Sequence, residues 1–344
     1  MAPKKTAPAA AAVMEKTAAD RANAAVEAHE EEIVALEVVP KNAGAVANLE
    51  DIQNMMLADS EEDLGFEKGD VAIPFFRVLQ SNSPQVKRQN AKYVEDAEAG
   101  MFFNTATNDI YSGDSKDGGV LVVPVYFTKQ ATLWLPRGEG NTGGGFAGEI
   151  PMDEAMELLK TCTKNAKNKD ITPPRQVMNM EQPQRLELTI SAMYYILIIN
   201  KSGDAMFETV AFPLTSTQMK KARTWNAIIK NSRLPNPGGV GSYRPAMFAY
   251  AYRLTTVPES NQHGDWMGVR IAQDTALIKY VDGKPQEMFS GAAQYYLAAR
   301  EFAELVKTGK AKAKLDEGYE EMGGGDQVDG GSGDSDVEED KPPF

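Results

Sequence analysis

The chain has 344 residues, of which 42% are hydrophobic and 8% aromatic, and its formal net charge at pH 7 is −13. This composition is sufficient for one large domain or two small ones, and no apolar stretch is long enough to span a membrane, so we expect a soluble, cytoplasmic protein. Two histidines (His29 and His263) and one cysteine (Cys162) are too few for a disulfide, a His-based catalytic relay or a multi-histidine metal site, so neither a cofactor nor an enzymatic activity is expected.

Charge is distributed unevenly along the chain. Residues 1–70 carry 15 acidic and 6 basic residues, and residues 315–344 carry 11 acidic residues and 1 basic residue. Residues 71–314 carry 29 Lys and Arg against 23 Asp and Glu, a net charge of +6. The sequence therefore predicts an acidic arm, partly helical or disordered, then a single β-rich domain, then a disordered acidic tail.

In the central part, short apolar runs separated by Gly, Pro, Asn and Asp predict β-strands. Residues 120–127 form one such run, and residues 131–135 are either its continuation or its hairpin partner. A short helix is expected over residues 152–159. The longest alternating run, residues 185–200, is predicted to contain a bulge near Ser191 and to form an antiparallel hairpin with residues 205–214.

In the second half of the central part, the patterns predict two longer helices with two extended runs between them. Thr215 or Ser216 is expected to cap a helix that extends to about Asn231, with an apolar stripe on one side and basic residues on the other. Residues 245–257 alternate, and their aromatic face is either core or a platform for stacking. A final strand over residues 266–272 and a closing helix over residues 287–307 complete the prediction.

The chain ends in an acidic, Gly-rich segment with an aromatic tip, Glu338-Glu339-Asp340-Lys341-Pro342-Pro343-Phe344. The terminal ring and the α-carboxylate lie together, and two prolines hold them extended, which suits a hydrophobic notch lined by Arg or Lys on a partner protein. This ending resembles the C-terminal tip of bacterial and phage single-stranded DNA-binding proteins. Lys341 interrupts the acidic run, and the chain is longer than most members of those families.

The resemblance implies sequence-independent binding of single-stranded DNA in phage-type replication, recombination and repair. It also implies that the tail competes with DNA and that its tip recruits a polymerase or helicase. The absence of regular βαβ alternation separately predicts a mainly β or α+β body with an antiparallel sheet. That this body is an oligonucleotide-binding (OB) barrel with inserted helices comes from the resemblance alone. The residues expected to bind partner proteins are Asp336, Glu338, Glu339, Asp340, Pro343 and Phe344.

The DNA-contacting residues are expected to be cations mixed with aromatic side chains, the combination that holds single strands. Trp225, on the predicted helix, either stacks on bases or anchors the helix to the sheet, and the helical pattern does not separate these two roles. The residues expected to contact DNA are Lys87, Arg88, Lys129, Trp134, Arg137, Lys220, Lys221, Arg223, Trp225, Lys230, Arg233, Tyr243 and Arg244.

Two further functions remain open from the sequence. A phage structural or scaffold protein, or a partner of the transcription machinery, would also suit acidic arms on a β-rich body. Affinity for single strands separates these functions from the DNA-binding one. The sequence also leaves open whether the chain forms a homo-oligomer.

Overall fold

The structure is a computed structural model that describes residues 73–136, 145–165, 168–177, 180–201, 206–237, 240–261 and 264–313. The predicted acidic arm, the acidic tail with its partner-binding residues, and Arg137 lie outside these residues. The described residues all belong to one unit of the chain, Phe66–Phe344.

The described part is mainly antiparallel β. Its centre is an eight-stranded sheet with the order β13-β12-β4-β8-β7-β6, to which β5 adds by pairing with β4 and β9 by pairing with β8. The strands of this sheet are β4 (Val120–Leu135), β5 (Gly145–Ile150), β6 (Thr163–Lys164), β7 (Asp170–Ile171), β8 (Glu187–Ile199), β9 (Phe207–Thr215), β12 (Tyr250–Asn261) and β13 (Gly264–Ala276).

Smaller elements surround this sheet. Three more sheets are formed by β1 (Phe76–Val78), β2 (Phe102–Asn104) and β3 (Ile110–Tyr111), by β10 (Leu234–Pro235) and β11 (Ser242–Tyr243), and by β14 (Ile278–Val281) and β15 (Lys284–Glu287). The helices are α3 (Met152–Leu159), α4 (Met219–Asn231) and α5 (Ala292–Lys307), with 3-10 turns η1 (Pro84–Val86), η2 (Ser216–Gln218) and η3 (Met247–Ala249).

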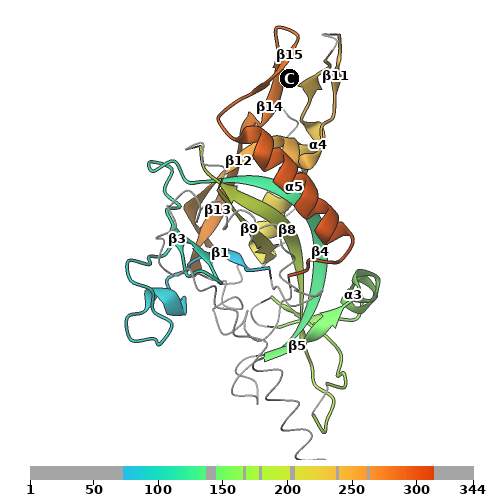
Figure 1. Ribbon diagram of the computed structural model, residues 1–344. Helices are drawn as coiled ribbons and strands as arrows, with labels where there is room; N and C mark the ends of the chain where they lie inside the picture. Colours follow the sequence, from blue (N-terminus) through green and yellow to red (C-terminus); the bar gives the residue numbers. More distant parts are fainter. Residues whose placement is uncertain are drawn as a thin grey trace, which may run out of the picture. The chain divides into compact units, whose positions relative to one another are not determined.

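β4 and β8 are the two central strands of the sheet. β4 is one continuous strand that pairs with β8 from Leu121↔Ile199 to Trp134↔Glu187, so residues 131–135 are a continuation and not a hairpin partner. The register shifts between Pro124 and Tyr126 of β4. A bulge bends its strand and increases the local twist, and the sheet curls into a half-barrel along β4 (Figure 1).

The predicted hairpin is confirmed, because β8 and β9 pair antiparallel from Ser191↔Thr215 to Ile199↔Phe207. The bulge predicted near Ser191 is wrong. Ser191 pairs in register with Gln130 on one side and Thr215 on the other, and the extra residue lies in the neighbouring strand β4.

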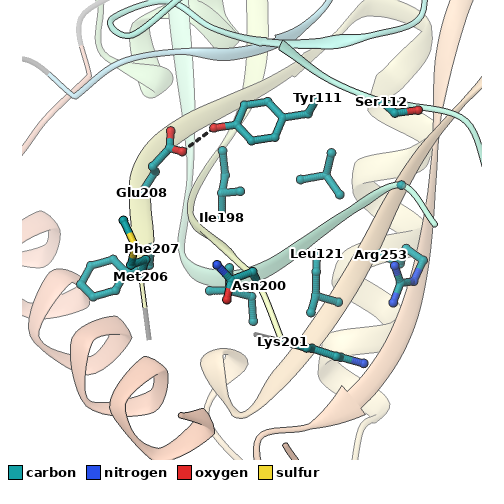
Figure 2. Close-up of a pocket in the computed structure, with 13 residues that line it drawn as sticks. Tyr111, Ser112, Leu121, Ile198, Asn200, Lys201, Met206, Phe207, Glu208 and Arg253 are labelled. Atoms are coloured by element: carbon teal, nitrogen blue, oxygen red, sulfur yellow. Dashed lines mark hydrogen bonds between the residues drawn. The ribbon is translucent and has the colours of Figure 1, made fainter. Parts of the chain in front are cut away.

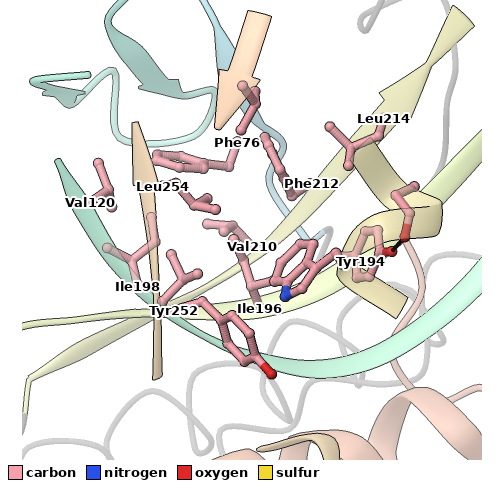
Figure 3. Close-up of a cluster of buried hydrophobic side chains, with 14 of the residues drawn as sticks. Phe76, Val120, Tyr194, Ile196, Ile198, Val210, Phe212, Leu214, Tyr252 and Leu254 are labelled. Atoms are coloured by element: carbon pink, nitrogen blue, oxygen red, sulfur yellow. Dashed lines mark hydrogen bonds between the residues drawn. The ribbon is translucent and has the colours of Figure 1, made fainter. Parts of the chain in front are cut away.

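Apolar cores cover both faces of the sheet. Tyr194 and Trp225 belong to a core on one face, which α4 and the β1–β2 strands cover, whereas Tyr195 and Tyr295 belong to a core on the opposite face, which α5 covers. Figure 3 shows the first core, in which side chains of β8, β9 and β12 converge. Burial from both sides explains why β8 is buried without interruption from Ser191 to Ile199.

The aromatic run of residues 245–257 belongs to the core. Tyr250, Tyr252 and Leu254 are buried on the α4 face, so the stacking-platform alternative is excluded for them. Phe248 packs on the opposite face, because the 3-10 turn η3 precedes β12 and breaks the alternation.

Three other boundaries differ from the predictions. α4 begins at Met219 after the turn η2, and neither helix start has a side-chain cap, so the predicted capping is wrong. The expected final strand lies within β13, but the β14–β15 hairpin follows it. Because β15 occupies residues 284–287, the closing helix begins at Ala292.

Replacing Trp225 with Ala should lower the free energy of unfolding by about 3–5 kcal/mol, since a large, fully buried ring leaves a cavity. Urea unfolding followed by circular dichroism measures this change. Thr224→Ala is the matched control, because Thr224 is exposed on the same helix and the change should stay within about 0.5 kcal/mol. Equal stabilities of the two variants would contradict the assignment of Trp225 to the core.

Candidate nucleic-acid interface

The inner face of α4 is fixed by an aromatic stack. The indole of Trp225 is fully buried and stacks on Tyr194 of β8, with ring centroids 4.2 Å apart and an interplanar angle of 25°. The single hydroxyl hydrogen of Tyr194 has two acceptors within reach, the carbonyl of Ala222 at 3.0 Å and Oδ1 of Asn226 at 2.9 Å. These contacts determine which side of the helix is turned toward the sheet and which side faces solvent.

The start of α4 is attached to the β12–β13 hairpin through Glu259. Its carboxylate accepts from Lys221 Nζ at 2.5 Å, from Gln218 Nε2 at 3.3 Å and from Trp266 Nε1 at 2.9 Å. The buried Gln218 also accepts from the backbone N–H of Val269 at 3.2 Å. Lys221, which was expected to contact DNA, is therefore engaged in an ion pair within the fold.

The outer face of α4 is basic. Lys220, Arg223 and Lys230 are exposed, α4 contains no acidic residue, and none of these three side chains forms an ion pair with a described residue. At 100° per residue the three positions lie within about 80° of one another, so they form one stripe along the helix. From Lys220 to Lys230 this stripe is about 15 Å long.

The stripe continues onto the β10–β11 hairpin. Arg233 is exposed, and its Nη1 donates to the carbonyls of Lys230 and Ser232 at 2.9 Å, which holds its stem at the end of the helix. Leu234 pairs with Tyr243, so Arg233 and Arg244 flank one end of this short antiparallel pair. Tyr243 and Arg244 are both exposed. We call Lys220, Arg223, Lys230, Arg233, Tyr243 and Arg244 the α4 surface.

Two tryptophans expected to contact DNA are instead part of the core. Trp225 is fully buried, and Trp134 is 8% exposed, packs edge-on against Phe146 and donates from Nε1 to Thr132 Oγ1 at 2.9 Å. Neither ring has a face open to a base. For Trp225 the structure selects the anchoring alternative, and for Trp134 it corrects the expected DNA contact. Residue type alone did not reveal this, because stacking and core aromatic residues have the same apolar character.

The remaining predicted cations are exposed on elements other than α4 and the β10–β11 hairpin. Lys87 and Arg88 follow η1 in the loop drawn in blue, on the opposite side of the view from α4 (Figure 1). Lys129 lies on β4. It pairs with Ala192 of β8, and because cross-strand partners share a face, Lys129 is on the face of the sheet that α4 covers.

A cavity lies where β4, β8 and β9 approach one another, and no motif or spacing in the sequence indicates it. Its volume is about 560 Å³, and Figure 2 shows Tyr111, Glu208, Lys201 and Arg253 at its walls. Glu208 accepts from the Tyr111 hydroxyl and from Asn104 Nδ2, the latter at 2.6 Å. Burial and then the hydrogen bond to Glu208 raise the pKa of Tyr111.

The cations of this cavity are neutralised by Asp274 of β13. Lys201 Nζ and Arg253 Nη2 each lie 2.7 Å from its carboxylate. Burial acts to raise the pKa of Asp274, but the hydrogen bonds from Lys201 and Arg253 outweigh burial, so this pKa lies below its usual value of 3.8. The cavity therefore presents apolar walls and paired charges, and it is a poorer site for phosphate than the α4 surface.

Other site chemistries find little support in the described residues. Within them, no three His, Cys, Asp or Glu side chains are grouped so that they would hold a metal ion. A search of the same residues for a helix long and apolar enough to cross a bilayer found none.

Comparison with protein families matches most of this chain. The model of a family described as Pam3 phage gp34-like protein matches residues 44–312, which include every described residue up to Lys312. No curated protein and no solved structure matches the chain.

Asp274→Asn should lower the free energy of unfolding by about 1 kcal/mol at neutral pH, because Lys201 and Arg253 lose their shared carboxylate. Since folding lowers the pKa of Asp274, its contribution is present above the usual carboxyl pKa and is lost as the pH falls through the lowered value. The difference from the wild type should therefore shrink toward about pH 2, as measured by urea unfolding across pH. Asp265→Asn, an exposed carboxylate of the same strand, is the control, and a pH-independent difference for Asp274→Asn would contradict the ionic role.

Proposed function

This chain belongs to the family of Pam3 phage gp34-like proteins, and we propose that it binds single-stranded DNA without sequence preference during phage replication, recombination and repair in the host cytoplasm. The observation that supports this proposal most directly is the α4 surface. There, exposed cations that form no ion pair with a described residue follow one helix face and continue onto a hairpin with an exposed tyrosine.

The physical basis of this binding is neutralisation of phosphates. Long cationic side chains on an outer helix face contact the DNA backbone, and backbone contacts carry no sequence information. Each phosphate contact releases counterions, so affinity should fall steeply with salt. Tyr243, 43% exposed at the end of the stripe, supplies a ring on which a base can stack.

The body is proposed to be OB-like. The curled antiparallel sheet supports this assignment, since an OB-fold is a partly open barrel of antiparallel strands. The chain would depart from that fold in two respects, since its sheet has eight strands and helices cover both faces of the sheet. The proposed DNA path accordingly follows the outer face of α4 and not the inside of the curled sheet.

The acidic tail is proposed to regulate this surface and to recruit partners. Its acids, among them Asp336, Glu338, Glu339 and Asp340, would occupy the α4 surface weakly and be displaced by phosphate. Pro343 and Phe344 would dock in a notch on a polymerase or helicase.

The first test is charge reversal on the α4 surface. A protein with Lys220→Glu, Arg223→Glu and Lys230→Glu should bind labelled oligothymidine at least about tenfold more weakly at low salt, because three phosphate contacts are lost. The slope of log K against log salt should become shallower by about two, at about 0.7 per contact for a single strand. Fluorescence anisotropy at several salt concentrations measures both quantities.

The matched control reverses the same number of charges elsewhere. Lys116, Arg270 and Arg300 are exposed and form no ion pair within the described part of the chain. If their reversal to Glu weakens binding equally, the effect is one of net charge, and the α4 surface is not the site. If the wild type binds no single strand at all, a phage structural or scaffold role, or one with the transcription machinery, replaces the proposal.

Removal of residues 323–344 should tighten binding to oligothymidine at low salt and have little effect at high salt, because the competition between tail and DNA is electrostatic. Deletion of Phe344 alone is the control, since it keeps all the acids and should leave DNA affinity unchanged. Unchanged affinity after removal of the whole segment would end the competing-tail hypothesis.

A further inference from the structure

A second, smaller cavity lies next to the α4 surface, at the end reached by the β10–β11 hairpin. Its volume is about 210 Å³. Five separate parts of the chain surround it, namely β10, β11, the segment of residues 245–249, β14 and α5. Because these parts are packed against one another through β10, β14, η3 and α5, the cavity is built into the fold and is not a gap between loops.

The walls of this cavity are mainly aromatic and apolar. Tyr243, Tyr280 and Tyr296 line it together with Leu234, Pro235 and Lys279. The Tyr296 ring is held in place by Phe248, with centroids 5.2 Å apart at 60°. Sites for whole drug-sized molecules are about 300–1,000 Å³, so this smaller cavity suits a single planar ring.

The polar groups of the cavity can form hydrogen bonds with a ring whose edge carries donors, acceptors or both. The hydroxyls of Tyr243, Tyr280 and Tyr296 form no hydrogen bond with a described residue. A tyrosine hydroxyl both donates and accepts, and it rotates to suit its partner, so these groups can satisfy the edge of any of the four bases. Lys279 adds a cation without an ion pair in the described part of the chain, which suits an adjoining phosphate.

The cavity is continuous with the α4 surface. Tyr243 belongs to both, and its cross-strand partner Leu234 follows Arg233 directly. The Tyr250 hydroxyl donates to the carbonyl of Arg233 at 2.7 Å, which fixes the junction between α4 and β10. A strand whose phosphates lie along α4 therefore reaches the cavity at the end of the basic stripe.

We propose that this cavity, the tyrosine pocket, receives one base of the single strand whose phosphates lie on the α4 surface. The base stacks against the tyrosine rings, and Lys279 and Arg244 hold the phosphates on either side of it. This inference rests on the proposed function. It adds that affinity depends on a base and not on phosphates alone, so an abasic strand is bound more weakly.

The test compares two probes of equal length and charge, labelled oligothymidine and a strand of abasic residues, by fluorescence anisotropy. The wild type should prefer oligothymidine by about tenfold, the order expected for one stacked base. Tyr280→Ala should lose about tenfold on oligothymidine and nothing on the abasic strand, with the salt slope unchanged for both. Tyr280→Phe keeps the ring and should restore most of the preference.

Leu297→Ala is the matched control, because Leu297 follows Tyr296 on α5 and is 60% exposed away from the pocket. It should bind both probes as the wild type does. Circular dichroism and the unfolding midpoint establish that each variant is folded.

The outcomes separate the two proposals. Wild-type binding to both probes with equal affinity, or a loss by Tyr280→Ala that is the same for both probes, overturns the pocket and leaves DNA binding intact. If the wild type binds neither probe, single-strand binding fails and the pocket fails with it.

Discussion

The stack of Trp225 on Tyr194 is the contact on which the α4 surface depends. An amphipathic helix buries its apolar side, and a large aromatic residue contributes most of the buried area. Here the indole of Trp225 lies against the ring of Tyr194 on the central strand β8. With the inner side fixed in this way, Lys220, Arg223 and Lys230 are turned to solvent. Lys221 is turned to the side and forms an ion pair with Glu259. The Trp225–Tyr194 stack therefore determines which cations of α4 are paired within the fold and which face solvent.

The central sheet makes this placement rigid. β8 pairs with β4 along its length and with β9 along most of it, and cores lie on both of its faces. Such a strand has no freedom to change register, because a slip of one residue would exchange the side chains of the two cores. The β10–β11 and β14–β15 hairpins are two-stranded sheets separate from the central sheet. They carry the exposed Tyr243 and the partly exposed Tyr280. The proposed DNA contacts are thus made by a rigid helix and by exposed side chains of two hairpins whose apolar residues pack on the cores.

Sequence patterns were reliable where burial and spacing agree. The β8–β9 hairpin, the helix from Met152 and the antiparallel character of the body follow from alternation and turn residues, and the structure has all three. The patterns failed where a local feature depends on contacts with residues distant in the sequence. The bulge in β4 arises from its pairing with β8, and the Gln218 contacts with β12–β13 belong to a turn that no local signal predicts. Long-range pairing decides both, and a single sequence does not encode it in any local window.

The sequence by itself determined the separation of a basic central part from acidic ends, the β-rich character of that part, and the presence of a basic, tryptophan-containing helix. These properties depend on composition and on periods of a few residues, which are read along the chain. Only the tertiary structure decided which aromatic residues are buried, which cations are paired, and that Tyr243, Tyr280 and Tyr296 surround one cavity. The physical reason is that exposure and pairing depend on residues distant in sequence, and the three tyrosines come from three elements that only the folded sheet brings together.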